Sequence, residues 1–241
     1  MKIAVVSHSD LAGGAARAAT RLHRGLLSAG LDSRMHVTQK QSSATSVVAP
    51  ITRLGRAWNL LRPALGHAML GLQKTEDHSW RSLALLPGLA GRKILAEEPD
   101  VVNLHWISDE TLSIGEVARL ARRLPLVWTL HDMWPFCGAE HYADEHPDAR
   151  WRHGYPRSSR PTTQSGIDLD RWTWRRKAAA WRDIPPIHLI APSHWIAACA
   201  AQSPLTREWP TSVIPNALDL HRFRPTPRRV ARQILGLPIE G

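Results

Sequence analysis

The stretch that decides the fold covers residues 3–38 and reads IAVVSHSDLAGGAARAATRLHRGLLSAGLDSRMHVT. Residues 3–8 form a short apolar run, which is typical of a buried parallel strand. After a loop, apolar residues recur at helical spacing up to Gly30, a residue suited to ending a helix. That helical set consists of Ala15, Ala18, Ala19, Leu22 and Leu26. Because residues 33–38 read as another strand, this unit predicts a parallel sheet with crossover helices.

The same alternation of strand and helix patterns continues along the chain. Further strands are predicted at residues 101–106, 125–130, 188–191 and 212–214, and helices at residues 116–123, 172–181 and 195–202. Residues 41–50 and 137–170 read as loops, and residues 51–72 as a basic amphipathic segment that Pro63 interrupts. We therefore predict an α/β fold, a Rossmann-like parallel sheet with helices on both faces. Its ligand site should lie at the carboxyl ends of the strands.

Length and composition bound the class of protein. The chain has 241 residues, of which 43% are hydrophobic, enough for one large domain or one domain with an extension. The sequence has no apolar run of about 18 residues and no signal-peptide pattern, so we predict a cytoplasmic protein. Cys137 and Cys199 belong to no CxxC pair. That fits a reducing compartment, although one long-range disulfide stays open as an alternative.

The net charge of +10 invites three kinds of partner: nucleic acid, anionic lipid or a phosphorylated substrate. The basic residues are nearly all arginines scattered among alanines, and the sequence contains no groove-reading helix or aromatic RNA platform. We therefore expect no nucleic acid partner. An anionic membrane surface stays open for the basic segment at residues 51–72, and core-facing helices are the alternative interpretation.

A glycine pair stands between the first strand and the first helix, in the loop Asp10-Leu11-Ala12-Gly13-Gly14. Glycines let a ligand approach the backbone, and the helix N-terminus behind them suits a phosphate or a developing anion. The loop matches neither GxGxxG nor the Walker motif, which argues against ordinary dinucleotide or ATP binding. A tight turn also needs glycine for structural reasons, so both interpretations stand.

Histidines follow two of the predicted strands. His131 and Asp132 end the strand at residues 125–130, and His105 ends the preceding one. A histidine can donate or accept a hydrogen bond near neutral pH, and a carboxylate can fix its tautomer. Adjacent residues need not touch, so a capping role for His131 and Asp132 is the alternative. If the two strands are neighbours, His105 should lie near His131.

The predicted loop at residues 137–170 is rich in groups that could bind metal. These are Glu140, His141, Tyr142, Asp144, Glu145, His146 and His153. Their spacing matches no zinc motif and includes no HExxH, so we predict a loop that shapes a substrate site and no bound metal. The sequence also has no GxSxG nucleophile elbow.

Four stretches of the sequence, taken together and in their order along the chain, resemble the N-terminal domain of the retaining glycosyltransferases of family four. The most specific is VIPNALDLHRFRP at residues 213–225, where Ala217 replaces the usual glycine. TLHDMWPFCG at residues 129–138 resembles a polysaccharide-building, colanic-acid-type branch. APSHW at residues 191–195 and the Gly13-Gly14 loop with Arg17 match further family segments. The resemblance extends over residues 2–225.

The resemblance implies the acceptor-side half of a two-domain GT-B fold, with residues 1–215 as that domain and residues 216–241 as a linker toward a donor-binding domain. It implies retaining transfer of a hexose from a nucleotide-sugar donor to a glycan or lipid-linked acceptor in polysaccharide biosynthesis, without metal or other cofactor. The donor would be held mainly by the second domain, so little transfer is expected from this chain alone. His131 and Asp132 become candidate catalytic residues. Candidate substrate-binding residues are Gly13, Gly14, Arg17, His105, Trp134, Ser193 and Asn216.

Two other functions remain open from the sequence. The same cleft would also serve a non-catalytic module that binds a glycan or a lipid-linked sugar. The basic segment at residues 51–72 would also serve a peripheral protein at the inner face of the cell membrane.

Overall fold

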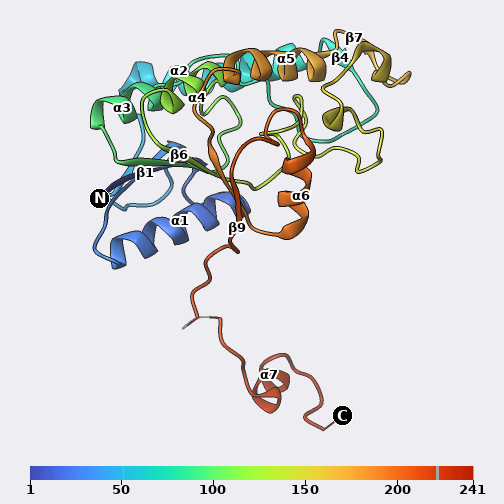
Figure 1. Cartoon of the computed structure of the whole chain (residues 1–241). Helices are drawn as coiled ribbons and strands as arrows, with labels where there is room; N and C mark the ends of the chain where they lie inside the picture. Colours follow the sequence, from blue (N-terminus) through green and yellow to red (C-terminus); the bar gives the residue numbers. More distant parts are fainter. Residues whose placement is uncertain (51, 221–222, 241) are drawn as a thin grey trace.

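A computed structural model describes residues 1–50, 52–220 and 223–240. Its centre is a seven-stranded sheet in the order β3-β2-β1-β5-β6-β8-β9, in which every pairing is parallel. These strands are β1 (Lys2–Ser9), β2 (Asp32–Gln39), β3 (Val47–Val48), β5 (Val101–Leu104), β6 (Leu126–Thr129), β8 (His188–Ala191) and β9 (Thr211–Val213). A separate antiparallel pair joins β4 (Gln73–Lys74) to β7 (Ser165–Gly166) at one end of the molecule (Figure 1).

Helices cover both faces of the sheet, as Figure 1 shows. One layer holds α2 (Arg53–Leu70), α3 (Ala90–Glu97), α4 (Ile114–Ala121) and α5 (Leu169–Trp181). The opposite layer holds α1 (Gly13–Ser28) and α6 (His194–Gln202). The predicted fold class, a Rossmann-like parallel sheet between two helix layers, is confirmed.

The side chains of β1 point alternately to the two faces of the sheet, which explains why helices cover both faces. Ile3 and Val5 belong to the apolar cluster that contains Ala19 of α1, whereas Ala4 and Val6 belong to the larger cluster on the other side of the sheet. Successive strand residues point to opposite faces, so a strand that is apolar at every position needs cover on both. Burying each such valine contributes about 1.5–3 kcal/mol.

The structure corrects the prediction that Pro63 interrupts its segment, because α2 runs without a break from Arg53 to Leu70. A proline inside a helix costs about 3 kcal/mol, and tertiary contacts of the neighbouring turn offset that cost. The buried Arg62 side chain donates a tertiary hydrogen bond to the Glu110 carbonyl and a second one, within α2, to Asn59 Oδ1.

The structure contains short strands and helices in segments that were predicted as loops or for which no element was predicted. The loop at residues 41–50 contains β3, and the loop at residues 137–170 contains β7 and two 3-10 turns, η1 (Arg150–Arg152) and η2 (Arg157–Ser159). The helix α3 was missed, since its eight residues carry too short a periodic pattern. Cys137 and Cys199 are both free thiols, which answers the open question of a disulfide between them.

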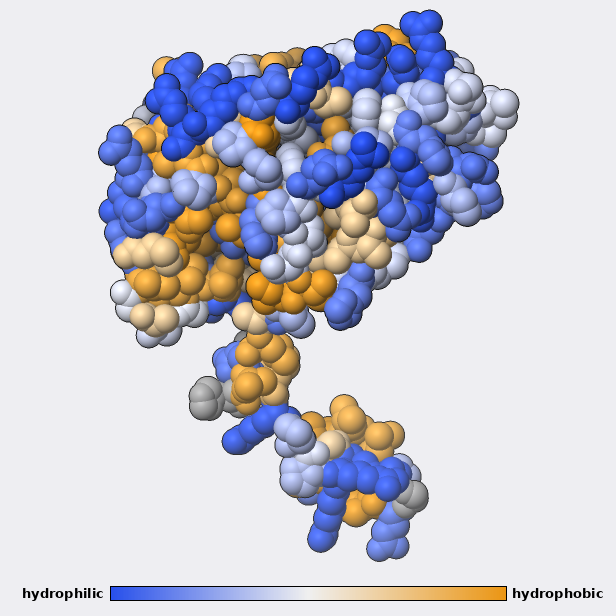
Figure 2. All heavy atoms as spheres, viewed as in Figure 1, coloured by the Kyte–Doolittle hydropathy of each residue, from blue (hydrophilic) through white to orange (hydrophobic). Residues whose placement is uncertain are grey.

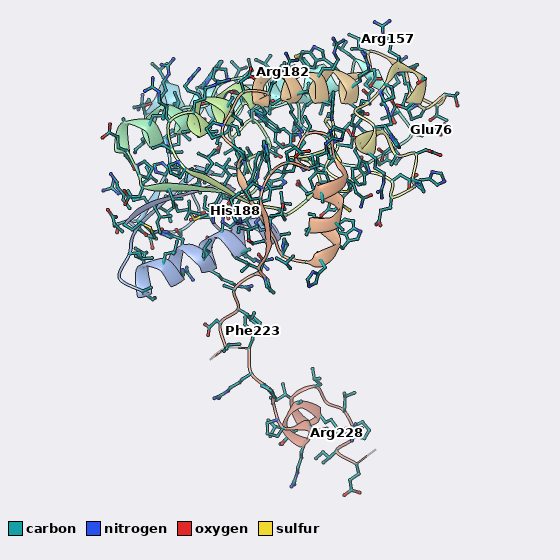
Figure 3. All side chains as sticks on the ribbon, in the orientation of Figure 1. Glu76, Arg157, Arg182, His188, Phe223 and Arg228 are labelled. Carbon is teal, nitrogen blue, oxygen red and sulfur yellow. The ribbon has the colours of Figure 1, made fainter. Side chains whose placement is uncertain are left out.

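After β9 the chain leaves the body, and α7 (Arg228–Ile234) lies apart from it in Figure 1. Hydrophobic side chains gather on this segment in Figure 2. Phe223, labelled in Figure 3, lies 5.5 Å from the guanidinium carbon of Arg21 on α1, measured to the ring centre. The predicted domain boundary at residue 215 stays a prediction.

Candidate functional site

A cleft of about 550 Å³ opens at the carboxyl edge of the central strands. Its wall comes from the ends of β1, β5 and β6, from the start of α1, and from Asn216 beyond β9. Because all these strands are parallel, their carboxyl ends meet at one edge, which is where open α/β sheets bind ligands. The predicted meeting of glycines and histidines along one edge is therefore observed.

The glycine loop in this wall is fixed from behind. The Asp10 carboxylate accepts hydrogen bonds from the backbone N–H groups of Gln41 (2.8 Å) and Ser42 (2.9 Å). Burial alone would raise the pKa of Asp10, but its hydrogen bonds to Ser42 and Gln41 outweigh burial and lower that pKa below the usual range. Ser9 Oγ accepts from the N–H groups of Leu11 and Ala12. The loop is thus held open before a ligand arrives.

The start of α1 faces the cleft without a protein anion of its own. Its N-cap residue Ala12 offers no side-chain oxygen, and no acidic residue stands in its first turn. Gly13 has φ +86°, which favours glycine, and a Cβ at either Gly13 or Gly14 would meet no protein atom within 4 Å. Close packing therefore does not require glycine at position 14. The free N–H groups of the helix start are suited to phosphate or another anion.

His105 and His131 meet as the strand order predicts. His105 Nδ1 lies 2.8 Å from His131 Nε2, and the rings are stacked with centres 5.1 Å apart. Burial lowers the pKa of His131 to about 4, and burial with the neighbouring His131 lowers the pKa of His105 to about 3. Both rings are therefore neutral near pH 7.

The tautomers of this pair follow from a buried atom. His105 Nε2 is buried and has no hydrogen-bond partner among the described residues. An unpaired buried N–H is rarer than an unpaired acceptor, so His105 carries its proton on Nδ1 and donates to His131 Nε2. His131 then carries its own proton on Nδ1. In the wall of the cleft, His131 is consequently a hydrogen-bond donor.

Asp132 serves other partners than His131. Its Oδ2 accepts hydrogen bonds from His141 Nδ1 (2.5 Å) and Trp106 Nε1 (2.7 Å), and its Oδ1 accepts from the Trp134 N–H. His141 Nε2 lies 2.9 Å from Ser82 Oγ. Asp132 thus orients an indole and an imidazole of the cleft wall.

His8 is a cleft residue that the sequence analysis did not single out. The Thr111 hydroxyl donates to the Ser108 carbonyl, so His8 Nδ1, 2.9 Å from Thr111 Oγ1, must be the donor in that contact. His8 Nε2 is then an acceptor. Burial lowers the pKa of His8, which keeps the ring neutral near pH 7. The signal was available, because His8 nears the end of β1 as His105 and His131 follow β5 and β6.

Two exposed aromatic side chains also line the cleft and were not predicted as binding residues. Trp80 is 52% exposed and Tyr142 is 55% exposed. Flat aromatic faces with a polar tip are suited to ligands that are apolar on one side and polar at the edge. Tyr142 comes from the loop that was predicted to shape a substrate site, and its position supports that prediction.

The predicted site residues divide into two groups. Gly13, Gly14, His131, Asp132 and Asn216 line the cleft, with His105 directly behind His131. The remaining three lie elsewhere, namely Arg17, Trp134 and Ser193.

Those three residues have other surroundings. Arg17 is exposed on α1, and Ser193 Oγ caps α6 by accepting from the Ile196 N–H. Trp134 is only 1% exposed, and its indole donates to the Ser82 carbonyl. Its ring also lies under the Lys177 ammonium, 3.6 Å from the ring centre. The end of β6 places His131 in the wall of the cleft, and the chain has turned into the core by Trp134.

Among the residues that the structure describes, no group of three or more His, Cys, Asp or Glu side chains could hold a metal ion. None of the helices formed by those residues is both long and apolar enough to cross a membrane.

The family model described as Glycosyltransferase Family 4 matches residues 12–222, which is most of the chain. A search of curated proteins found no match.

Proposed function

The chain belongs to Glycosyltransferase Family 4, and from this premise we propose that its cleft is the acceptor side of a sugar-transfer site. The reaction would move a sugar from a nucleotide-sugar donor to a hydroxyl of a glycan or lipid-linked acceptor. The observation that carries the proposal is that His131 and the start of α1 at Gly13 and Gly14 line one cleft, and that no acidic residue stands in the first turn of that helix.

Transfer breaks the bond between C1 of the sugar and the diphosphate oxygen and forms a bond between C1 and the acceptor oxygen. The nucleoside diphosphate departs with the electron pair of the broken bond. Its leaving oxygen gains negative charge and basicity as the bond breaks, and it takes the proton that the acceptor hydroxyl loses. Negative charge therefore develops on the phosphate side, where prepositioned N–H groups are most effective.

The residues of the cleft fit these needs. The N–H groups at the start of α1 would stabilise the departing diphosphate. His131 Nδ1–H would donate to a hydroxyl of the transferred sugar, and His8 Nε2 would accept from a hydroxyl of the acceptor. Trp80 and Tyr142 would contact the flat face of a sugar ring. Asp132 would act indirectly, as the residue that positions Trp106 and His141.

Finer features of the proposal rest on the sequence resemblance. We propose retention of configuration, a hexose as the transferred sugar, and a role in polysaccharide biosynthesis in the cytoplasm. The HDMWPFCG segment at residues 131–138 supports the polysaccharide-building branch.

Saturation-transfer NMR of the chain tests the proposal. The probes are UDP-glucose, GDP-mannose and the methyl glycosides of glucose, galactose and mannose. We expect saturation of at least one glycoside by the wild type, and an affinity about 3–10-fold weaker in His131→Ala. His153→Ala, a change at an exposed loop histidine, is the matched control. Absence of saturation for every probe, or equal binding by His131→Ala, would overturn the proposal.

A second candidate function rests on α2. We propose that its outer face binds an anionic lipid surface, because Leu54 is 84% and Leu60 is 76% exposed, and Leu61 and Leu65 are exposed beside them. Arg53 and Arg56 are exposed on the same helix. The neighbouring helices add basic side chains to this layer, among them Arg182 at the top of Figure 3, and hydrophilic atoms cover much of it in Figure 2. Exposed leucines among basic residues are the pattern of an interfacial helix.

Vesicle sedimentation distinguishes this function from a purely soluble one. The double change Leu54→Glu with Leu61→Glu should abolish binding to phosphatidylglycerol vesicles that the wild type binds. Leu27→Glu alters an exposed leucine of α1 in the opposite helix layer and should leave binding unchanged. A substitution of Trp58 would test the membrane role less cleanly than the leucine substitutions, because the Trp58 indole donates to the Pro87 carbonyl and is half-buried. Equal sedimentation of all three proteins would dismiss the membrane role.

A further inference from the structure

A second cavity of about 200 Å³ lies beside the cleft, between the end of β2 and the starts of α2 and α3. One water molecule occupies about 10–15 Å³ of such a volume. The cavity is many times larger and therefore has room for a small organic molecule. One part of its wall is apolar, with Val48, Pro50 and Leu89. We call it the β2–α3 cavity.

The polar part of the wall is basic. Arg62 and Lys93 line the cavity together with His36, and none of the described lining residues is Asp or Glu. Arg62 is 1% exposed, and its Nε has no hydrogen-bond partner in the described chain. Lys93 is exposed, and no carboxylate of the described residues lies within ion-pair distance of it. Lys93, which has no ion pair among the described residues, lies beside this apolar wall, and the combination favours an anion that carries an apolar part.

Backbone and hydroxyl groups add to this preference. Leu89 and Ala90, where α3 begins, stand in the wall, and no side chain caps that helix and no acid occupies its first turn. Thr38 and Thr111 contribute hydroxyls to the same wall. Three carboxylates lie nearby: Glu97 pairs with His36 at 3.2 Å, Glu116 accepts from the Gly88 N–H beside the start of α3, and Glu110 accepts from the Leu86 N–H. None of them lines the cavity.

A short chain of contacts joins this cavity to the cleft. Thr38 Oγ1 donates to Thr111 Oγ1 (3.3 Å), and Thr111 Oγ1 accepts from His8 Nδ1 (2.9 Å). His8 lines the cleft, whereas Thr38 and Thr111 line the β2–α3 cavity. A ligand that contacts either hydroxyl therefore changes the surroundings of a cleft histidine.

We propose that the β2–α3 cavity binds a small organic anion, a phosphate monoester or carboxylate that carries a short apolar substituent. Lys93 and Arg62 bind the anionic group, and Val48, Pro50 and Leu89 contact the apolar substituent. This inference does not depend on sugar transfer, so its test can fail while the proposed function stands.

Isothermal titration of the chain with n-hexyl phosphate, inorganic phosphate and 1-hexanol tests the proposal. We expect one site for hexyl phosphate. The affinities for inorganic phosphate and hexanol should be at least about tenfold weaker, since each of these probes lacks either the apolar chain or the anionic group. Lys93→Glu should weaken hexyl phosphate binding at least about tenfold. Lys74→Glu makes the same charge change on β4, outside the cavity, and should bind as the wild type does.

Two further measurements locate the site. Side-chain NMR signals of His8 should shift when hexyl phosphate is added to the wild type, and the shift should be smaller in Thr38→Val. Thermal melting of each variant verifies folding, and Lys93→Gln replaces Lys93→Glu if the latter fails to fold. Equal binding by the Lys93 variant and by Lys74→Glu would overturn the proposal. Equal affinity for hexanol or for inorganic phosphate would also overturn it.

Discussion

His141 Nδ1 lies 2.5 Å from Oδ2 of Asp132, so the carboxylate next to His131 in sequence belongs to a different histidine. Residues 131 and 132 face different neighbours because adjacent residues at the end of a strand point in opposite directions. His131 pairs with His105 of the adjacent strand end, and Asp132 holds the loop that follows β6.

Replacing Asp132 with Asn should destabilise the chain by about 1–3 kcal/mol, since a neutral amide leaves its buried donors poorly paired. The donors affected are His141 Nδ1 and Trp106 Nε1. Urea unfolding at pH 7 measures the effect. Asp148→Asn alters a carboxylate whose side chain is 89% exposed and is the control. Equal midpoints for the two variants would contradict the structural role of Asp132.

Stability should fall as the pH is lowered from about 6.5 toward 4. The folded pKa values of His131, about 4, and His105, about 3, lie below the unfolded value of 6.5. The stability that these neutral rings contribute is therefore fully present above pH 6.5. It is lost as the pH falls toward the folded pKa values, because the unfolded chain binds the protons first.

Urea unfolding at pH 7, 6, 5 and 4 checks this pH dependence. His105→Asn, which removes one of the two rings, should flatten the decline between pH 6.5 and 4 relative to the wild type. His153→Asn should leave the slope unchanged, since this exposed histidine is outside the pair. An unchanged slope in His105→Asn would show that other groups, such as the buried His36 and His23, cause the decline.

Gly13 and Gly14 should respond differently to alanine. Gly14→Ala should leave the free energy of unfolding within about 0.5 kcal/mol of the wild type, because the added methyl meets no protein atom. It should nevertheless weaken binding of a nucleotide sugar, since the methyl projects where a ligand would approach the helix start. Gly13→Ala should destabilise by about 1–2 kcal/mol, because its φ of +86° disfavours alanine. Thermal melting and ligand titration of both variants separate these effects.

Lys177 should be a structural lysine. Its buried ammonium donates to the carbonyl oxygens of Trp134, Cys137 and Gly138. Burial lowers the pKa of Lys177 to about 7. Lys177→Met keeps the aliphatic length but leaves the carbonyls unpaired, so we expect a loss of about 2–4 kcal/mol in urea unfolding. Lys74→Met alters an exposed side chain of β4 and is the control, and a loss no larger than in that variant would refute the role.

Much of the fold could be predicted because its signals are local. The apolar run of β1, the helical spacing after Gly14 and the strand pattern before His131 each span less than about 18 residues and reflect the packing of one element. The order of neighbouring strands then brought His105 and His131 together, as predicted. The prediction of a break at Pro63 was wrong because a tertiary contact of the neighbouring Arg62 helps to offset the local cost of a proline inside a helix.

The cleft was predicted less completely than the fold. Trp80, His141 and Tyr142 reach its wall from segments without a periodic pattern, and only the folded chain shows which of their side chains face inward. Trp134 illustrates the reverse error, since its position two residues after Asp132 suggested a binding residue but the side chain is in the core. Thr111 was not considered at all, because its contact with His8 spans a sequence separation of 103 residues.

The two indoles in the cleft wall, Trp80 and Trp106, also give the molecule a built-in optical reporter. Trp128, Trp134 and Trp151 are fully buried, and the exposed Trp172 and Trp195 lie outside the cleft, so the fluorescence of these five should be insensitive to what enters it. Emission from Trp80, which is largely in contact with water, should shift to shorter wavelength when a sugar ring displaces that water. Ligand entry could then be followed in the unmodified chain, without a label and without turnover.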